Sequence, residues 1–589
     1  SCAGRIYHRS GHKNHRLKRY RNKRTEMEQN RKGIIIVKGV QWTVVSALLL
    51  LSVMPMETSW SDGEWWHAVS LPVAVLVIAV LYFILGSRFR ISVVDLFVLS
   101  WTLLAGVLTY SGYGVVTPTA FYRFMEMACT YVLLRLLFSL RCVDPRLLIV
   151  GIALASLYEA MLGVSQMVEG TSRHAYYPVT GSFLNPGPYA AFLAVGASLL
   201  MAQLKTMDGR PWLKRLAWAT MFLLFALLGI AFSRAALLAV GIVAWMVYGQ
   251  RMRRNRWLLW LGVVVVAFGL YWMKMGSAHG RLVIWNISLR AISEQGLLGS
   301  GLGSFPHAFA QQSADYFTVY PAAAQMADVC DNAFNEFLTL AVEQGGIGLL
   351  LFAAVLFFSG KTLYAANRPL FCAGVALLVF ALFSYPFQCL SYRLLLVLLC
   401  AYAASVDNGA WQCLMGKKYV AVLAALTLLL SVGMGEEIAQ RKQAVDEYRQ
   451  LSYSNNAYAV DDYQTLLPWL SDNAPFLFDF AKGLSDNGRY NDSNAMLEKG
   501  ILVSADPMFY VCMGNNYAAQ SLYKEAQQSY QYAYNLLPNR LYPLYKLMKV
   551  HEQQHHEQAV YHLAKRIVRF HEKVMSPAVR EMKREAQQK

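Results

Sequence analysis

Apolar stretches of roughly 20 residues recur from Gly33 to about Gly435, and each is long enough for a helix to cross the hydrocarbon core of a bilayer. We count about thirteen, with a range of about 11–13 because two stretches are short. A lipid-exposed chain must satisfy its backbone hydrogen bonds internally, which a helix does. The sequence therefore predicts an all-α, polytopic membrane protein. The stretches are 33–54, 67–86, 92–110, 120–140, 145–168, 186–206, 211–232, 234–250, 257–274, 335–359, 369–385, 388–405 and 418–435.

Positive charge is distributed unevenly between the predicted loops. The chain carries 54 Lys and Arg against 36 Asp and Glu, a net charge of +18. Without residues 1–32, alternate loops hold 16 Lys and Arg on one side and 6 on the other. Because Lys and Arg gather in cytoplasmic loops, we expect a cytoplasmic N-terminus and a periplasmic tail. Half of the net charge falls in residues 1–32, and topology accounts for most of the remainder, so a nucleic-acid partner is not expected.

Metal and cofactor sites are not expected. The nine cysteines are scattered, mostly inside apolar runs, and form no CxxC pair or Cys/His cluster. A thiol in such a run usually behaves as a small hydrophobic group. We therefore expect neither a zinc site nor a disulfide framework.

The two ends of the chain differ from the apolar middle, 33–435. Residues 1–32 form a basic leader with eleven Lys and Arg, within which Met27 is a candidate native start. Residues 436–589 are expected to form a separate helical domain, in which 490 and 523 are both Tyr and 526 and 559 are both Ala, 33 residues apart. The region 474–573 resembles tetratricopeptide repeats, which offer a concave surface to a protein partner. A non-repetitive helical bundle is the alternative.

The longest outer connection, 274–334, is expected to carry function, because long loops without a role are uncommon. Residues 281–293 read as an amphipathic helix, followed by a glycine-rich turn that is either a tight turn or a phosphate cradle. Arg234 lies among apolar residues at the outer membrane boundary, where an ionisable group is a functional candidate unless it reaches the headgroups.

A few further polar and aromatic residues are candidate contacts to a glycan or an acceptor. Asn185 precedes an apolar helix whose first N–H groups would face the outer surface. Tyr176, Tyr177 and Tyr385 are predicted to lie at the same side. Aromatic anchoring at the membrane interface is their alternative role.

Four segments in order resemble the bacterial O-antigen ligase superfamily, which also includes O-antigen polymerases and protein O-oligosaccharyltransferases. They are TGSFLNPGPYAAFLA, FSRAALLA, GRLVIWNISLRAI…GLLGSGLGSF and AFNEFLTLAVEQGGIGLLLF, and the resemblance covers roughly 70–405.

The resemblance implies a metal-independent glycosyltransferase at the periplasmic face of the bacterial inner membrane. It would move a glycan from undecaprenyl diphosphate to a hydroxyl of lipid A core or of a protein, and polymerisation is the alternative. Arg234 and Arg281 match the family's arginines and are expected to hold the diphosphate, with Arg290 as a third candidate.

The chain departs from the family pattern at Phe334, where related sequences commonly carry a histidine that helps deprotonate the acceptor. We expect Asn335 and an acidic residue, Asp331 or Glu336, to serve catalysis instead. The alternatives are His279 or His307 as the base, or catalysis without a side-chain base. The alternative role of Asp331 is that of a helix N-cap.

Two other classes of function are alternatives, a polysaccharide transporter or flippase and a non-catalytic membrane scaffold. A transporter predicts charged residues near mid-membrane in two related halves. No such repeat occurs within 33–435. A scaffold predicts that Arg234 and Arg281 lie far apart, whereas a transferase needs both at one cavity.

Overall fold

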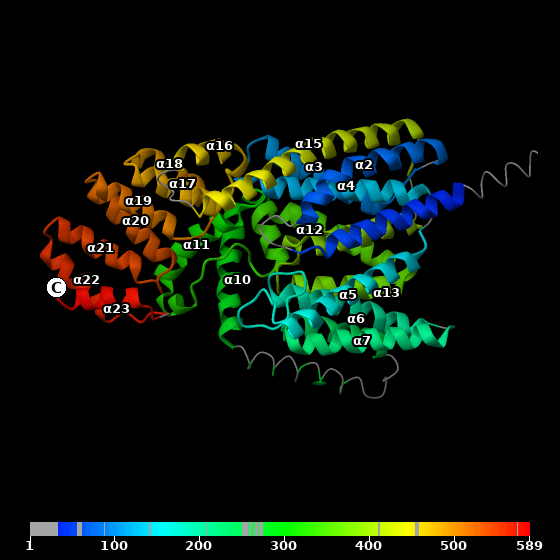
Figure 1. The fold of residues 1–589 in the computed structure, drawn as a ribbon, viewed down its shortest axis with the longest axis horizontal. Helices are drawn as coiled ribbons and strands as arrows, with labels where there is room; N and C mark the ends of the chain where they lie inside the picture. The colour runs from blue at the N-terminus through cyan, green and yellow to red at the C-terminus, as the bar shows by residue number, and fades with distance from the viewer. Residues whose placement is uncertain are drawn as a thin grey trace, which may run out of the picture.

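A computed structural model of the chain is almost entirely helical (Figure 1). It describes residues 33–589 except 56–61, 87–88, 141–142, 208, 410–412, 454–458, 574 and most of 250–274. The membrane part contains the helix Gly33–Ser52 followed by α2 (Asp62–Leu85), α3 (Val93–Tyr110), α4 (Pro118–Leu140), α5 (Pro145–Glu169), α6 (Pro186–Thr206), α7 (Pro211–Ala231), α8 (Arg234–Tyr248), α12 (Glu336–Ala366), α13 (Arg368–Ala381), η2 (Pro386–Gln388), α14 (Leu390–Val406) and α15 (Lys417–Leu451).

The predicted apolar stretches are helices throughout the described region. Among the described residues, eight helices are long and apolar enough to cross a membrane, and α8, α13 and α14 are shorter apolar helices. With α4, these account for twelve of the thirteen predicted stretches. The remaining stretch, 257–274, lies largely outside the described residues. The chain is therefore a multi-pass membrane protein.

Two of the loops predicted to lie on the cytoplasmic side pair with each other. The strand β1 (Phe89–Ile91) forms an antiparallel ladder with β2 (Cys413–Met415), with Phe89 opposite Met415. Loops that share a ladder must lie on the same side of the membrane. This agrees with the predicted alternation of loops.

The polar helix α4 sits among apolar helices because its charges are paired. Arg135 donates to both carboxylate oxygens of Asp95 on α3, at 2.7 Å each. Glu126 lies 2.5 Å from the ring of His67 on α2. Buried charges persist only when they are paired in this way. Most of the α4 pairs involve α2 and α3, so they fix these three helices together.

The remaining helices form the part expected outside the membrane. They are α10 (Met275–Gln295), α11 (Phe305–Val319), η1 (Pro321–Met326), α16 (Val460–Leu470), α17 (Ala474–Asp486), α18 (Tyr490–Ile501), α19 (Met508–Ala519), α20 (Tyr523–Leu536), α21 (Tyr542–Gln553), α22 (Glu557–Val568) and α23 (Pro577–Ala586). α15 runs without a break past the expected domain boundary at residue 435.

The C-terminal helices form repeated pairs. The first helices of the three pairs begin at 474, 508 and 542, an increase of 34 each time. The turn inside each pair holds one residue in the left-handed region: Gly488 (φ 73°), Ser521 (φ 61°) and His555 (φ 57°). The predicted periodicity therefore corresponds to structurally equivalent helix pairs.

These pairs dock onto the connection that contains α10 and α11 (Figure 1), where α11 packs against α20. The Asn539 side chain donates to the carbonyl of Ala327 at 2.7 Å. The ring of His307 lies 3.1 Å from the carbonyl of Ile501. The loop is thus held by the C-terminal domain of the same chain.

Asp472 links the C-terminal domain to the start of α4. Its carboxylate accepts from the Thr119 backbone N–H at 2.7 Å and pairs with Arg441 of α15 at 3.0 Å. Hydrogen bonds to a charged group contribute about 1.5–3 kcal/mol. We expect Asp472→Ala to expose the turn between α16 and α17 to proteolysis, because the contact to α4 is lost.

Limited chymotrypsin digestion in detergent measures this effect, because Trp469 and Phe476 offer cleavage sites on either side of the turn. Asp461→Ala, an exposed carboxylate on α16, is the matched control. Equal cleavage rates for wild type and both variants would contradict the assigned role of Asp472.

Candidate functional site

Arg234 and Arg281 come together in one cluster. Arg234 is the first residue of α8, and its Nη2 donates to the hydroxyl of Ser277 at 3.2 Å. Ser277 precedes Arg281 by four residues on α10, so both lie on the same helix face. Burial lowers the pKa of Arg281, and the positive charge of Arg234 lowers it further. The two guanidinium groups are therefore close enough to repel, as expected of a site for an anion.

Phe334 covers the Arg281 side of this cluster. The Arg281 guanidinium lies 5.4 Å from the centre of the Phe334 ring, and the centre of the Tyr385 ring lies 5.5 Å from the same point. Phe334 adopts φ 49°, a left-handed conformation that is unusual for a bulky residue. The backbone N–H of Phe334 donates to the Asn332 side chain at 2.9 Å, which holds this turn.

A second phenylalanine is strained beside Arg234. Phe232 also has φ 49°, in the turn between α7 and α8. Strained backbone of this kind is concentrated at functional sites. Strained backbone therefore occurs beside Arg234 and beside Arg281, which supports a functional role of the cluster.

The three predicted catalytic residues occupy different positions. Asn335 caps α12, because its side-chain oxygen accepts from the backbone N–H groups of Phe337 and Leu338 at 3.0 and 3.2 Å. Glu336 begins the helix, and its carboxylate accepts from the Phe387 backbone N–H at 2.6 Å. Asp331 lies in the preceding loop, so the N-cap role considered for it belongs to Asn335.

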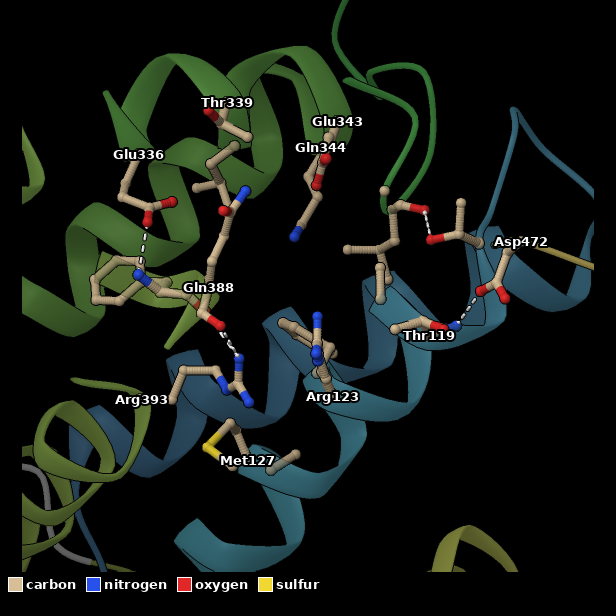
Figure 2. Close-up of a pocket in the computed structure, with 18 of the residues that line it drawn as sticks. Thr119, Arg123, Met127, Glu336, Thr339, Glu343, Gln344, Gln388, Arg393 and Asp472 are labelled. Carbon is tan, nitrogen blue, oxygen red and sulfur yellow. Dashed lines mark hydrogen bonds between the residues drawn. The ribbon is translucent and has the colours of Figure 1, made fainter. Parts of the chain in front are cut away.

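A cavity of about 560 Å³ opens beside these residues (Figure 2). One wall is a polar stripe on the first turns of α12, consisting of Glu336, Thr339, Glu343 and Gln344. Figure 2 shows Arg123 and Arg393 on the opposite side. Most of the remaining lining is apolar and aromatic, including Trp101, Phe124, Phe352 and Phe387.

Two of the three arginines that line the cavity, Arg123 and Arg393, are tied to one buried carboxylate. Glu64 pairs with Arg123 at 3.1 Å and also with Arg393. Arg393 further donates to the carbonyls of Phe387 and Gln388 at 3.1 and 3.2 Å. The segment between α13 and α14 is thereby fixed, with Tyr385 contacting Phe334 on one side and Phe387 lining the cavity on the other.

The glycine-rich turn has a packing role. Gly299, Gly301 and Gly303 all have positive φ. A Cβ at Gly299 would meet the backbone of Gly345 at 2.4 Å, and one at Gly301 would meet the carbonyl of Val115 at 2.4 Å. The turn therefore packs directly on α12 and on the segment before α4. Of the two predicted alternatives, this arrangement corresponds to the tight turn.

Other predicted residues lie elsewhere. Arg290 contacts the rings of Tyr316 and Tyr320, at 5.0 and 5.2 Å. Tyr176 is 88% exposed. The following residue, Tyr177, packs against His174, and Asn185 caps α6 through the Gly187 N–H at 2.9 Å. His279 lies on α10 two residues before Arg281.

Sequence reasoning missed Glu64, Arg123 and Arg393 as a unit. Arg123 and Arg393 lie inside the predicted apolar stretches 120–140 and 388–405. The available signal was their position in apolar segments, where ionisable groups are costly and therefore informative.

Fold and site together define a multi-pass helical membrane protein with a paired-arginine site beside a mainly apolar cavity that has one polar wall. Residues 219–353 match the family described as O-antigen ligase. This chain therefore carries an O-antigen ligase family domain, which includes Arg234, Arg281 and Glu336. A match to this family implies a glycosyl-transferring enzyme that uses a lipid-linked glycan. No curated protein matches the chain significantly.

The C-terminal domain also acts on Asp331 electrostatically. Loss of hydration raises the pKa of Asp331, and the negative charge of Asp506 raises it further. A carboxyl whose pKa is higher in the folded state makes folding less favourable as pH rises from its unfolded pKa, about 3.9, through its folded pKa. Asp506→Asn removes the negative charge that raises the pKa of Asp331. The variant should therefore lose less folding stability between the unfolded and the folded pKa of Asp331.

Melting temperatures of wild type and Asp506→Asn between pH 4 and 7 test this expectation. The substitution keeps an oxygen acceptor for the Met508 N–H, which Asp506 now binds at 2.8 Å. The variant's advantage should grow as pH rises and then level off. An advantage independent of pH would contradict the coupling.

Proposed function

We propose that the chain is an inner-membrane glycosyltransferase that transfers a glycan from undecaprenyl diphosphate to a hydroxyl acceptor on the periplasmic face. The observation that supports this proposal most directly is the hydrogen bond from Arg234 to Ser277, which lies one helical turn before Arg281 on α10. Two guanidinium groups on one face suit a diphosphate, because each offers a planar fork of donors.

In this mechanism Arg234 and Arg281 bind the diphosphate and stabilise the negative charge that develops on it. The acceptor oxygen attacks the anomeric carbon, the bond from that carbon to the phosphate oxygen breaks, and undecaprenyl diphosphate leaves. Fixed positive charge in a site shielded from water is an effective way to stabilise such a leaving group.

Glu336 takes the proton of the acceptor hydroxyl in this proposal. It follows the Phe334–Asn335 turn that lies against Arg281, and it lines the cavity. Its carboxylate is oriented by the Phe387 N–H. Asp331 lines the same cavity and is the alternative base.

Placement on the periplasmic face rests on the charge distribution of the loops and on the β1–β2 ladder between two loops of the other side. The acceptor classes considered are lipid A core and a protein hydroxyl, and a polymerase that uses a second glycan is the alternative within the same family. A protein partner at the tetratricopeptide-like repeats remains a separate proposal.

Deletion of the gene in its native host tests the function. We expect loss of one class of surface polysaccharide or glycoprotein, with undecaprenyl-diphosphate-linked glycan accumulating in the membrane. Complementation with wild type should restore the pattern. Unchanged surface glycans and an unchanged pool of lipid-linked glycan would contradict the proposal.

A further inference from the structure

The cavity is not built by the membrane helices alone. Trp469 and Pro475 of the C-terminal domain line it together with Arg123 and Glu336 of the membrane part. Asp472 lies between these two C-terminal residues in sequence and binds the start of α4. The C-terminal domain thus supplies a wall of the cavity and is anchored beside it.

The chemistry of the walls favours a ligand with many hydroxyl groups. Carboxylate, amide and hydroxyl side chains on α12 face arginines across the cavity. These groups have partners within the protein, such as the Phe387 N–H for Glu336 and the Trp101 ring N–H for Gln344, and carboxylate, amide and guanidinium groups can each make further hydrogen bonds to a ligand. Aromatic side chains between them offer flat apolar faces, which suit the C–H faces of sugar rings.

The size of the cavity points the same way. About 560 Å³ falls within the range of about 300–1,000 Å³ that is usual for sites of compact ligands. A single Ser or Thr side chain would fill only a small part of this volume. A short saccharide unit would fill it and reach both polar walls.

We propose that this interdomain cavity binds the saccharide that accepts the transferred glycan, and that Trp469 and Pro475 form a specificity-determining wall of the site. The inference rests on the proposed function and deepens it by naming the acceptor class. The acceptor lies on the Phe387 side of the α13–α14 segment, and the donor diphosphate lies at Arg281, near Tyr385.

Photo-crosslinking in the native host tests the proposal with the full chain. The photoreactive residue p-benzoylphenylalanine replaces Trp469 or Pro475. As a control, it replaces Lys482, an exposed residue on α17. After irradiation, the purified adducts are analysed for carbohydrate by mass spectrometry. We expect saccharide adducts at positions 469 and 475, and none above background at 482.

The same experiment in an Arg281→Ala background separates the acceptor from the donor. Adducts that persist without donor binding support an acceptor site. Loss of the adducts would assign the saccharide to the donor and overturn the proposal, as would adducts that contain only phospholipid or protein. Capture does not require turnover, so an absence of transferase activity would refute the proposed function separately.

A kinetic comparison gives a second readout. Pro475→Trp should raise the KM for the acceptor and leave the KM for the lipid-linked donor unchanged, whereas Lys482→Trp should change neither. The folded state of each variant is checked by its melting temperature. An unchanged acceptor KM in a folded Pro475→Trp protein would overturn the role of this wall.

Discussion

Arg281→Ala is expected to lower the rate of glycan transfer by about 10²–10³-fold, the usual effect of removing one preorganised donor to a developing negative charge. The guanidinium is positioned over Phe334 and beside Arg234, and burial already lowers its pKa. A bound anion would offset the repulsion between Arg281 and Arg234 and would stabilise the charged form of both side chains. The rate is measured as undecaprenyl diphosphate released per enzyme in detergent.

Two variants of the same helix serve as controls. Arg281→Lys keeps the charge but loses the planar fork, so it should recover only part of the rate. Arg290→Ala removes an arginine that contacts Tyr316 and Tyr320, and it should retain most of the activity. If Arg290→Ala were as damaging as Arg281→Ala, the assignment of the diphosphate to the Arg234–Arg281 cluster would fail.

Glu64→Ala is expected to destabilise the membrane domain by about 3–5 kcal/mol, because removing one partner leaves buried charge uncompensated. Glu64 is 2% exposed and pairs with both Arg123 and Arg393. These arginines come from α4 and α14, so the loss would also loosen the walls of the cavity.

Thermal unfolding in detergent, followed by the fraction of protein that remains monodisperse, measures this effect. The control is Asp62→Ala in the same helix turn. Asp62 is half exposed and lies 3.5 Å from Lys442, a pair that should contribute no more than about 1 kcal/mol. Equal midpoints for the two variants would show that Glu64 is not a central support of this fold.

Most of the helical architecture could be predicted because each membrane helix is recorded locally, as one apolar stretch of the right length. The paired structure of the C-terminal domain was predictable for the same reason, since equivalent residues recur at a fixed spacing. The left-handed residues Ser521 and His555 were not predictable, because Ser and His carry no strong signal for that conformation.

The cavity could not be predicted, because its parts are distant in sequence. Glu64 and Arg393 are separated by 329 residues, and a single sequence does not show which buried charges pair. Helix boundaries also mattered. Asn335 was expected to be catalytic, but α12 begins directly after it, and its side chain caps the helix. Its catalytic role therefore stays a prediction.

The position of the C-terminal domain was the other missing element. The repeat pattern indicated a surface for a separate partner, whereas α11 of the same chain packs against α20. Contacts such as Asn539 to Ala327 depend on the geometry of both partners, which periodicity does not describe.

The most direct test of the central claim is release of undecaprenyl diphosphate by the purified chain. Proteoliposomes would contain the protein and undecaprenyl-diphosphate-linked glycan from the native host, with a host membrane extract as the source of acceptor. We predict release by wild type, and almost none by the Arg234→Ala/Arg281→Ala double variant in its folded form. Equal release by both proteins would contradict the account.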